Sequence, residues 1–158
     1  MLPRMKRTSF AGMECSVART LDVVGEWWSL LVLRDAFCGV RRFEDFQRSL
    51  GIARNILTDR LQTLCDCGVL EKRRYQERPE RFEYRLTDKG RDLYPVLLSL
   101  MRWGDRWAMD ASPGPPMVLT HKSCGHDVMP VLVCPECRQD VEARGMAWRR
   151  REGVASGN

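Results

Sequence analysis

The stretch that decides the fold is RFEDFQRSLGIARNILTDRLQTLCDC, residues 42–67. Apolar residues recur at helical spacing over residues 42–50 and again over residues 54–67, which predicts two short helices. Residues 51–53, Gly-Ile-Ala, form a tight turn between them. The apolar stripe of the second helix is narrow and consists of Leu57, Leu61 and Leu64. Two short helices joined by a glycine-containing turn are typical of a helix-turn-helix.

The residues that follow predict a β-hairpin. Gly68 ends the second helix, and residues 69–75 and 81–86 are expected to be strands. Residues 76–80, with Pro79, form the turn between them. A hairpin directly after a helix-turn-helix is the wing of a winged helix.

A long helix is predicted over residues 88–108, capped by Thr87 and kinked at Pro95. Its apolar residues exceed what one flank of a small domain can bury, which indicates a homodimer. The candidate interface residues are Leu100, Trp103 and Trp107.

Upstream, residues 1–14 look like a basic arm, and Ser16 is predicted to cap a first helix that ends at Gly25. Residues 26–37 are apolar on most sides, so we expect a central buried helix there. The predicted fold class is mainly α (α+β). It is a winged helix-turn-helix over residues 15–111, with a long C-terminal dimerisation helix and a small cysteine-rich appendage.

The composition restricts the function classes. A net charge of +5 and a pI near 9.0 are mild indications of a polyanionic partner. No apolar stretch is long enough for a membrane span and no secretory signal is evident, so we expect a cytoplasmic protein without a membrane partner. Seven cysteines in a reducing compartment indicate metal binding, thiol chemistry or burial rather than disulfides. No catalytic motif is present, so we expect no enzyme, and the sequence shows no evident internal repeat.

The helix over residues 54–67 carries candidate DNA-reading side chains on the side away from its apolar stripe. Arg54, Asn55 and Thr58 lie near its start, where a recognition helix enters the major groove. Arginine can contact guanine and asparagine can contact adenine through two hydrogen bonds each. A merely solvated polar face is the alternative. Arg60 lies on the other flank, where a salt bridge and a phosphate contact are equally plausible.

Arginines around the predicted hairpin suit the DNA backbone or the minor groove. Arg78 and Arg81 flank Pro79 at the tip, and Arg42 begins the preceding helix, where it can add a phosphate contact. Glutamates alternate with these arginines. The alternative is therefore a hairpin whose acidic and basic side chains face solvent and bind no DNA.

Beyond a linker at residues 112–117, residues 118–141 are predicted to form a zinc-ribbon-like segment. The predicted zinc ligands form two pairs, His121-x-x-Cys124 and Cys134-x-x-Cys137. Two close pairs suit a tetrahedral Zn²⁺, and four protein ligands favour a structural ion over a catalytic one. The alternatives are His126 in place of His121, free cysteines in a loose tail, or a redox-active dithiol. Residues 142–158 are expected to fray.

A set of motifs recurs along the chain from Cys15 to about Trp107. These are the leading Cys15, Gly25-x-Trp27, Leu57-x-x-Arg60-Leu61, Arg81-x-x-Tyr84 and Leu86-Thr87. In order and spacing they resemble the HxlR family of bacterial regulators, which are relatives of the MarR group. The resemblance implies a dimeric winged helix-turn-helix that binds double-stranded operator DNA, often near its own gene. Glu26 and the second tryptophan, Trp28, depart from the family pattern, and the core pattern does not include the segment after Pro116.

The same resemblance makes Cys15 a candidate redox sensor, because some family members are thiol-based stress sensors that use the N-terminal cysteine. A predicted helix N-terminus and the basic arm beside Cys15 favour its thiolate. A thiol without a role, buried or exposed, is the alternative.

The leading hypothesis is a homodimeric, sequence-specific DNA-binding repressor. The helix over residues 54–67 would lie in the major groove, and the wing over residues 75–82 on the backbone or in the minor groove. The competing hypotheses are a redox or metal enzyme built on the cysteine-rich segment, and a protein-interaction module that uses it. Only the first hypothesis needs a basic helix followed by a basic wing.

Overall fold

The computed structural model describes residues 9–10, 12–109 and 114–149. The chain forms two compact units, Met1–Tyr94 and Pro95–Ser156. The boundary between them falls at Tyr94, earlier than the predicted linker at residues 112–117. Parts of the predicted arm, linker and tail lie outside the described residues.

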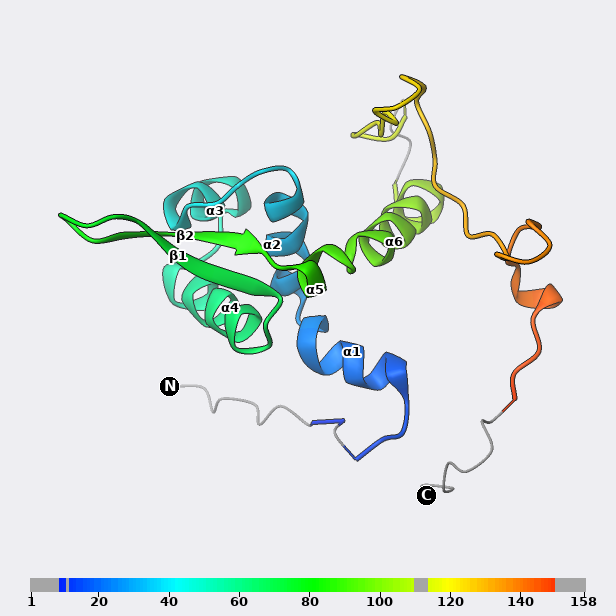
Figure 1. Ribbon diagram of the computed structural model, residues 1–158, viewed down its shortest axis with the longest axis horizontal. Helices are drawn as coiled ribbons and strands as arrows, with labels where there is room; N and C mark the ends of the chain where they lie inside the picture. Colours follow the sequence, from blue (N-terminus) through cyan, green and yellow to red (C-terminus); the bar gives the residue numbers. More distant parts are fainter. Residues whose placement is uncertain (1–8, 11, 110–113, 150–158) are drawn as a thin grey trace. The chain divides into compact units, whose positions relative to one another are not determined.

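The first unit contains the predicted helix-turn-helix (Figure 1). Its helices are α1 (Ser16–Val24), α2 (Trp27–Phe37), α3 (Phe43–Leu50) and α4 (Arg54–Asp66). Gly51 ends α3 with a φ of 61°, a left-handed conformation that costs glycine little, and the chain turns there into α4. The stripe on α4 is fully buried, as is Phe46 of α3. The helix-turn-helix and the face on which it packs are therefore confirmed.

The wing is an antiparallel hairpin of β1 (Leu70–Gln76) and β2 (Arg81–Leu86). Its tip extends past α3 and α4 in Figure 1. The segment before α3 joins the outer side of β2, since the Tyr84 N–H donates to the Arg41 carbonyl over 2.7 Å. The fold is thus a winged helix-turn-helix, and the start of α3 lies beside the wing.

Two predicted helix ends are wrong. Cys15, not Ser16, is the N-cap of α1, and its side chain makes no capping hydrogen bond. The predicted helix over residues 88–108 is two helices, α5 (Asp88–Arg91) and α6 (Tyr94–Trp107). Pro95 explains the break, because proline has no N–H to donate to the Arg91 carbonyl and its ring would clash with that carbonyl in a continuous helix. In the first turn of α6 the proline is tolerated, because the N–H groups there have no partner within the helix. Thr87 caps α5 as predicted, accepting from the Gly90 N–H over 3.0 Å.

Helix α2 is central as expected, since it packs against α1, α3, α4 and β2, but one of its faces is exposed. Val32 and Leu33 are fully buried, but Trp27 is 85% exposed and Leu31 is exposed one turn further on. Helix α1 likewise exposes Val17 and Leu21 at a spacing of four residues. Each helix therefore presents a second apolar face that the described residues leave open to solvent.

The second unit contains a structural repeat, which corrects the interpretation of the sequence as free of repeats. Residues 119–128 (LTHKSCGHDV) and residues 132–141 (LVCPECRQDV) are two turns offset by 13 positions. Each turn has one isolated β-bridge, Thr120 with Asp127 and Val133 with Asp140. A short 3-10 helix, η1 (Ala143–Gly145), follows.

The second unit has no core of its own in the part of the chain that the structure describes. No residue among 95–109 or 114–149 is buried. Helix α6 places Val96, Leu100, Trp103 and Trp107 on one exposed face. None of the helices formed by the described residues combines the length and the apolar character that a membrane span requires.

Candidate nucleic-acid interface

Helix α4 exposes the side chains predicted to read bases. Its buried leucine stripe fixes the rotation of the helix, so that Arg54, Asn55 and Thr58 all face solvent at its start. The Thr58 hydroxyl donates to the Arg54 carbonyl over 2.9 Å, which leaves the Thr58 oxygen free to accept. Ile56, which the sequence analysis did not select, is 39% exposed on the same turn. An apolar side chain at this place can contact a thymine methyl group.

A groove with a volume of about 530 Å³ separates the start of α3 and α4 from the wing. Basic and aromatic side chains line it in stacked pairs. The pairs are Arg54 over Phe43 at 4.8 Å, Arg42 over Tyr75 at 4.8 Å and Lys72 over Phe82 at 4.2 Å from the ring centre. Such stacking holds each cation in place and leaves its N–H donors directed outward. The aromatic partners were not evident from the sequence, because they come from three different elements.

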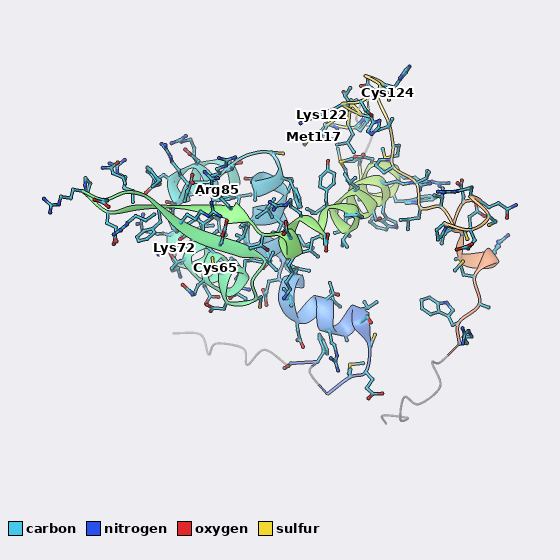
Figure 2. The ribbon with its side chains drawn as sticks, in the orientation of Figure 1. Cys65, Lys72, Arg85, Met117, Lys122 and Cys124 are labelled. Carbon is cyan, nitrogen blue, oxygen red and sulfur yellow. The ribbon has the colours of Figure 1, made fainter. Side chains whose placement is uncertain are left out.

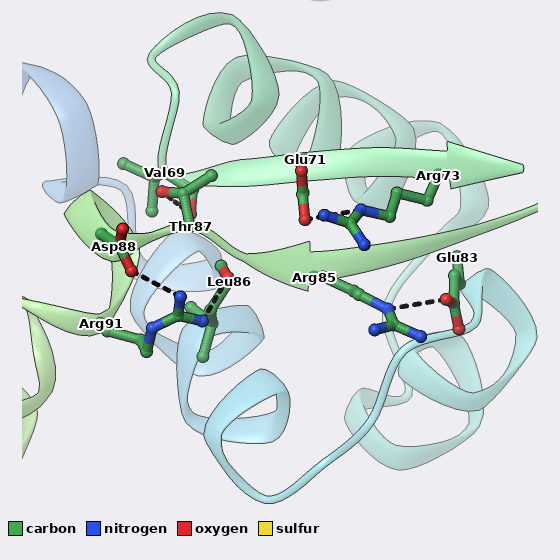
Figure 3. A network of polar contacts seen from close by, with 9 residues as sticks. All are labelled: Val69, Glu71, Arg73, Glu83, Arg85, Leu86, Thr87, Asp88 and Arg91. Atoms are coloured by element: carbon green, nitrogen blue, oxygen red, sulfur yellow. Dashed lines mark hydrogen bonds and ion pairs between the residues drawn. The ribbon is translucent and has the colours of Figure 1, made fainter.

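The two faces of the wing differ in charge. The register pairs Lys72 with Tyr84 and Arg74 with Phe82 on the face that lines the groove. On the other face Arg73 pairs with Glu71 at 2.8 Å and Arg85 pairs with Glu83 at 2.7 Å (Figure 3). Arg91 is likewise paired with Asp88, at 2.6 Å. Arg73 and Arg85 are therefore neutralised by neighbouring acids. The groove also has acids in its lining, Glu44, Asp45 and Glu80, but Arg42, Arg54 and Lys72 form no ion pair with them or with any other described residue.

The predicted DNA-contacting arginines of the groove and wing keep their charges free. Arg42, Arg54, Arg78 and Arg81 are exposed, and none forms an ion pair with any residue that the structure describes. At the tip, Glu80 and Glu77 lie 3.4 and 3.8 Å from Arg74, so Arg74 partly offsets both acids. Arg78 consequently keeps its charge for an external partner.

Arg60 is held within the fold. Its side chain is only 15% exposed and pairs with Asp59 and, over 3.7 Å, with Glu26 at the N-cap of α2. The pair with Glu26 ties α4 to α2, whereas Asp59 belongs to α4 itself, and the two acids together hold Arg60 rather than leaving it free for a phosphate. The geometry favours the structural alternative for Arg60, and it gives Glu26 a role.

The cysteines of the first unit differ in environment. Cys15 is half-buried at the N-cap of α1, and Cys38 is exposed after α2. Burial raises the pKa of the Cys65 thiol above its ordinary value, Asp66 raises it further, and Lys72 lowers it; Figure 2 labels Cys65 and Lys72. A thiol whose pKa is raised is a poor nucleophile, which agrees with a packing role for Cys65.

The structure brings the predicted zinc ligands together in two pairs but not as a set of four. His121 Nδ1 lies 3.2 Å from Cys124 Sγ in the first turn of the second unit. In the second turn, backbone N–H groups of Cys137 and Glu136 lower the pKa of Cys134, and the Cys137 thiol adds to this effect. No group of three or more potential metal ligands converges among the described residues.

Comparisons with known proteins assign the family. The HxlR-like helix-turn-helix pattern matches residues 23–112, more than half of the chain. An uncharacterized HTH-type transcriptional regulator of Mycobacterium tuberculosis, Rv3095, is 46% identical over 131 residues, which cover 83% of this chain and 82% of the relative. The chain therefore belongs to the HxlR-like helix-turn-helix family, whose relatives are named as transcriptional regulators.

Solved structures support the same assignment. PA1607, described as a candidate transcription factor, is 38% identical with a TM-score of 0.81 and covers 91% of this chain and 100% of its own. The redox regulator HypR in its oxidized form is 34% identical with a TM-score of 0.54, covering 58% of this chain and 96% of its own. The matches to Rv3095 and PA1607 cover so much of this chain that both must extend past residue 117. They therefore include at least part of the cysteine-rich segment, which lies beyond the residues matched by the family pattern.

Proposed function

We propose that this regulator is a homodimeric, sequence-specific repressor that inserts the start of α4 into the major groove of its operator. The wing then lies along the backbone or in the minor groove. The observation that carries the proposal is the uneven charge of the winged helix. Arg42, Arg54, Arg78 and Arg81, around the groove and the wing tip, are exposed and have no acidic partner among the described residues, whereas Arg73 and Arg85, further along the wing, are paired with glutamates.

The arginine at the wing tip is expected to contribute to DNA binding in a different way from the arginine on α4, and this difference can be tested. Arg78→Ala should weaken binding to every DNA sequence alike, because a wing-tip cation binds phosphates rather than bases. The plot of log affinity against log salt should become flatter by about 0.9 for each phosphate that the variant no longer neutralises. Fluorescence anisotropy over a salt series measures both effects.

Arg73→Ala is the matched control, since it removes the same charge from the paired face of the same hairpin. Its salt slope should stay close to that of the parent. Equal flattening by both substitutions would show that the wing acts only through its total charge.

A second part of the proposal is a thiol response through Cys15. It is supported by the similarity to HypR, described as a redox regulator, and by the position of Cys15 at the N-cap of α1, where it is only half-buried and its side chain makes no capping hydrogen bond. Diamide should change DNA affinity in the parent and in Cys38→Ser, but not in Cys15→Ser. Cys38 is the control because it is the exposed cysteine of the same unit. An unchanged response in Cys15→Ser would remove Cys15 from the regulatory mechanism.

A further inference from the structure

The two turns of the second unit share one hydrogen-bond pattern. In each turn the residue at the first ligand position donates its N–H to a carbonyl five residues later, His121 to His126 over 2.9 Å and Cys134 to Gln139 over 2.8 Å. The bases of the turns are closed in the same way, by Val128 to Leu119 and Val141 to Leu132, both over 2.8 Å. The repeat is therefore one of backbone geometry as well as of sequence.

The residue after the second ligand position is left-handed in both turns. Gly125 has a φ of 71° and Arg138 a φ of 61°. Each donates its N–H back to the carbonyl of the first ligand position, over 2.7 Å to His121 and 2.9 Å to Cys134. Glycine adopts this conformation readily, but it is uncommon for arginine. The second turn has the same backbone shape although it has arginine instead of glycine at this position. We infer that the hydrogen bonds of the turn impose this shape.

This shape directs two ligand atoms to the same side of each turn. Two donors on one tetrahedral zinc ion, with Zn–N near 2.0–2.1 Å and Zn–S near 2.3 Å, lie about 3.6 Å apart. His121 Nδ1 and Cys124 Sγ lie 3.2 Å apart, close to that separation. In the second turn, Cys134 and Cys137 occupy the equivalent positions. Each turn has the form of half a tetrahedral site.

The repeat also decides between the two histidines. His126 corresponds to Gln139 of the second turn. In each turn the backbone carbonyl of this residue accepts a hydrogen bond from the N–H of the first ligand position. His121 corresponds to Cys134, a ligand position. The matching set of four is therefore His121, Cys124, Cys134 and Cys137.

We propose that the two turns close on a single structural Zn²⁺ held by His121, Cys124, Cys134 and Cys137 of one chain. Each turn supplies two ligands, and only three residues, 129–131, separate one turn from the next. This short tether keeps the second pair at high effective concentration for an ion held by the first. Three residues span at most about 10 Å, so a bound ion leaves the turns little freedom.

The burial pattern explains why an ion is needed. The valines and Leu132 of this segment are exposed, Leu119 is only half-buried, and no described residue of the second unit is buried, so apolar packing cannot hold the turns together. Small segments of this kind are stabilised by metal binding, which then supplies the folding free energy. Four protein ligands leave no open position for water, so the ion is structural. Figure 2 shows the first turn, where Lys122 and Cys124 are labelled.

Native mass spectrometry of the full chain, purified without chelator, tests the proposal. We expect one zinc ion per chain in the parent. Cys124→Ser and Cys137→Ser should each lose it, and His121→Gln should bind it at least about ten times more weakly, as expected when one zinc ligand is removed. His126→Gln and Cys38→Ser are matched controls that should retain it. A metal-free parent, or loss of zinc in His126→Gln with retention in His121→Gln, would overturn the assignment.

Three further measurements distinguish a broken site from a misfolded chain and from a site shared by two chains. Cobalt substitution should give thiolate-to-cobalt charge-transfer bands of a three-cysteine tetrahedral site, which weaken on removal of any of the three cysteines. A mixture of Cys124→Ser and Cys137→Ser chains should bind no zinc, and recovery of zinc in the mixture would overturn closure within one chain. The helical circular-dichroism signal shows that each variant still folds.

Discussion

Arg54→Ala and Asn55→Ala should each weaken binding to the operator by about 1–3 kcal/mol, or roughly 5- to 150-fold, and reduce the preference over shuffled DNA. Both residues lie on the first turn of α4, and both are exposed. Arg54 is stacked on Phe43, which orients its guanidinium before DNA arrives. A side chain that is already oriented loses less entropy on binding, so its removal should cost affinity near the upper end of that range.

Gln62→Ala is the control for this prediction. Gln62 is exposed on the same helix, but it lies two turns further on and its amide donates to Asp66 over 2.7 Å. Its substitution should have little effect on affinity and none on base preference. If Arg54→Ala and Asn55→Ala both bound operator like the parent, the start of α4 would not be the reading surface.

Trp103→Ala should weaken the homodimer by about 2 kcal/mol or more, roughly 30-fold, because buried tryptophans are among the largest contributors to interfaces. Trp103 is 62% exposed on α6, next to Leu100 and Trp107 on the same face. So large an exposed apolar stripe is typical of a surface that a second subunit covers. Analytical ultracentrifugation of the parent at micromolar concentration should show a species near twice 18.3 kDa.

Trp148→Ala is the matched substitution, because Trp148 is 98% exposed and lies outside α6. It should leave the dimer intact. Operator affinity should fall with dimer stability in Trp103→Ala, since two recognition helices about one DNA turn apart contact the two half-sites together. A parent that sediments as a monomer would refute the interface.

The helix-turn-helix and the wing could be predicted because their signals are local. Three leucines at helical spacing decide the buried face of α4, and alternation in β2 decides the hairpin. The exposed faces of α1 and α2 could not be predicted. An apolar residue such as Trp27 fits the helical spacing equally well whether it packs inside its own domain or remains on the surface. Pro95 indicates a disruption, but whether it kinks or breaks a helix depends on the turn before it.

The groove was only partly predictable. The arginines were evident from the sequence, whereas their aromatic partners became evident only after β1, β2 and α3 were placed side by side. The repeat in the second unit was obscured because histidine stands in the first turn where the second has cysteine, and arginine stands in the second turn where the first has glycine. The feature that the two turns share is the hydrogen-bond pattern, which sequence spacing does not show.

The central claim is that the winged helix recognises a particular DNA sequence. Fluorescence anisotropy can test it with a labelled duplex taken from the region upstream of the gene, competed by the same duplex unlabelled and by a shuffled duplex at one fixed salt concentration. We expect the native duplex to compete at least about 10³-fold better than the shuffled one, the lower end for specific regulators. Equal competition by the two duplexes would contradict it.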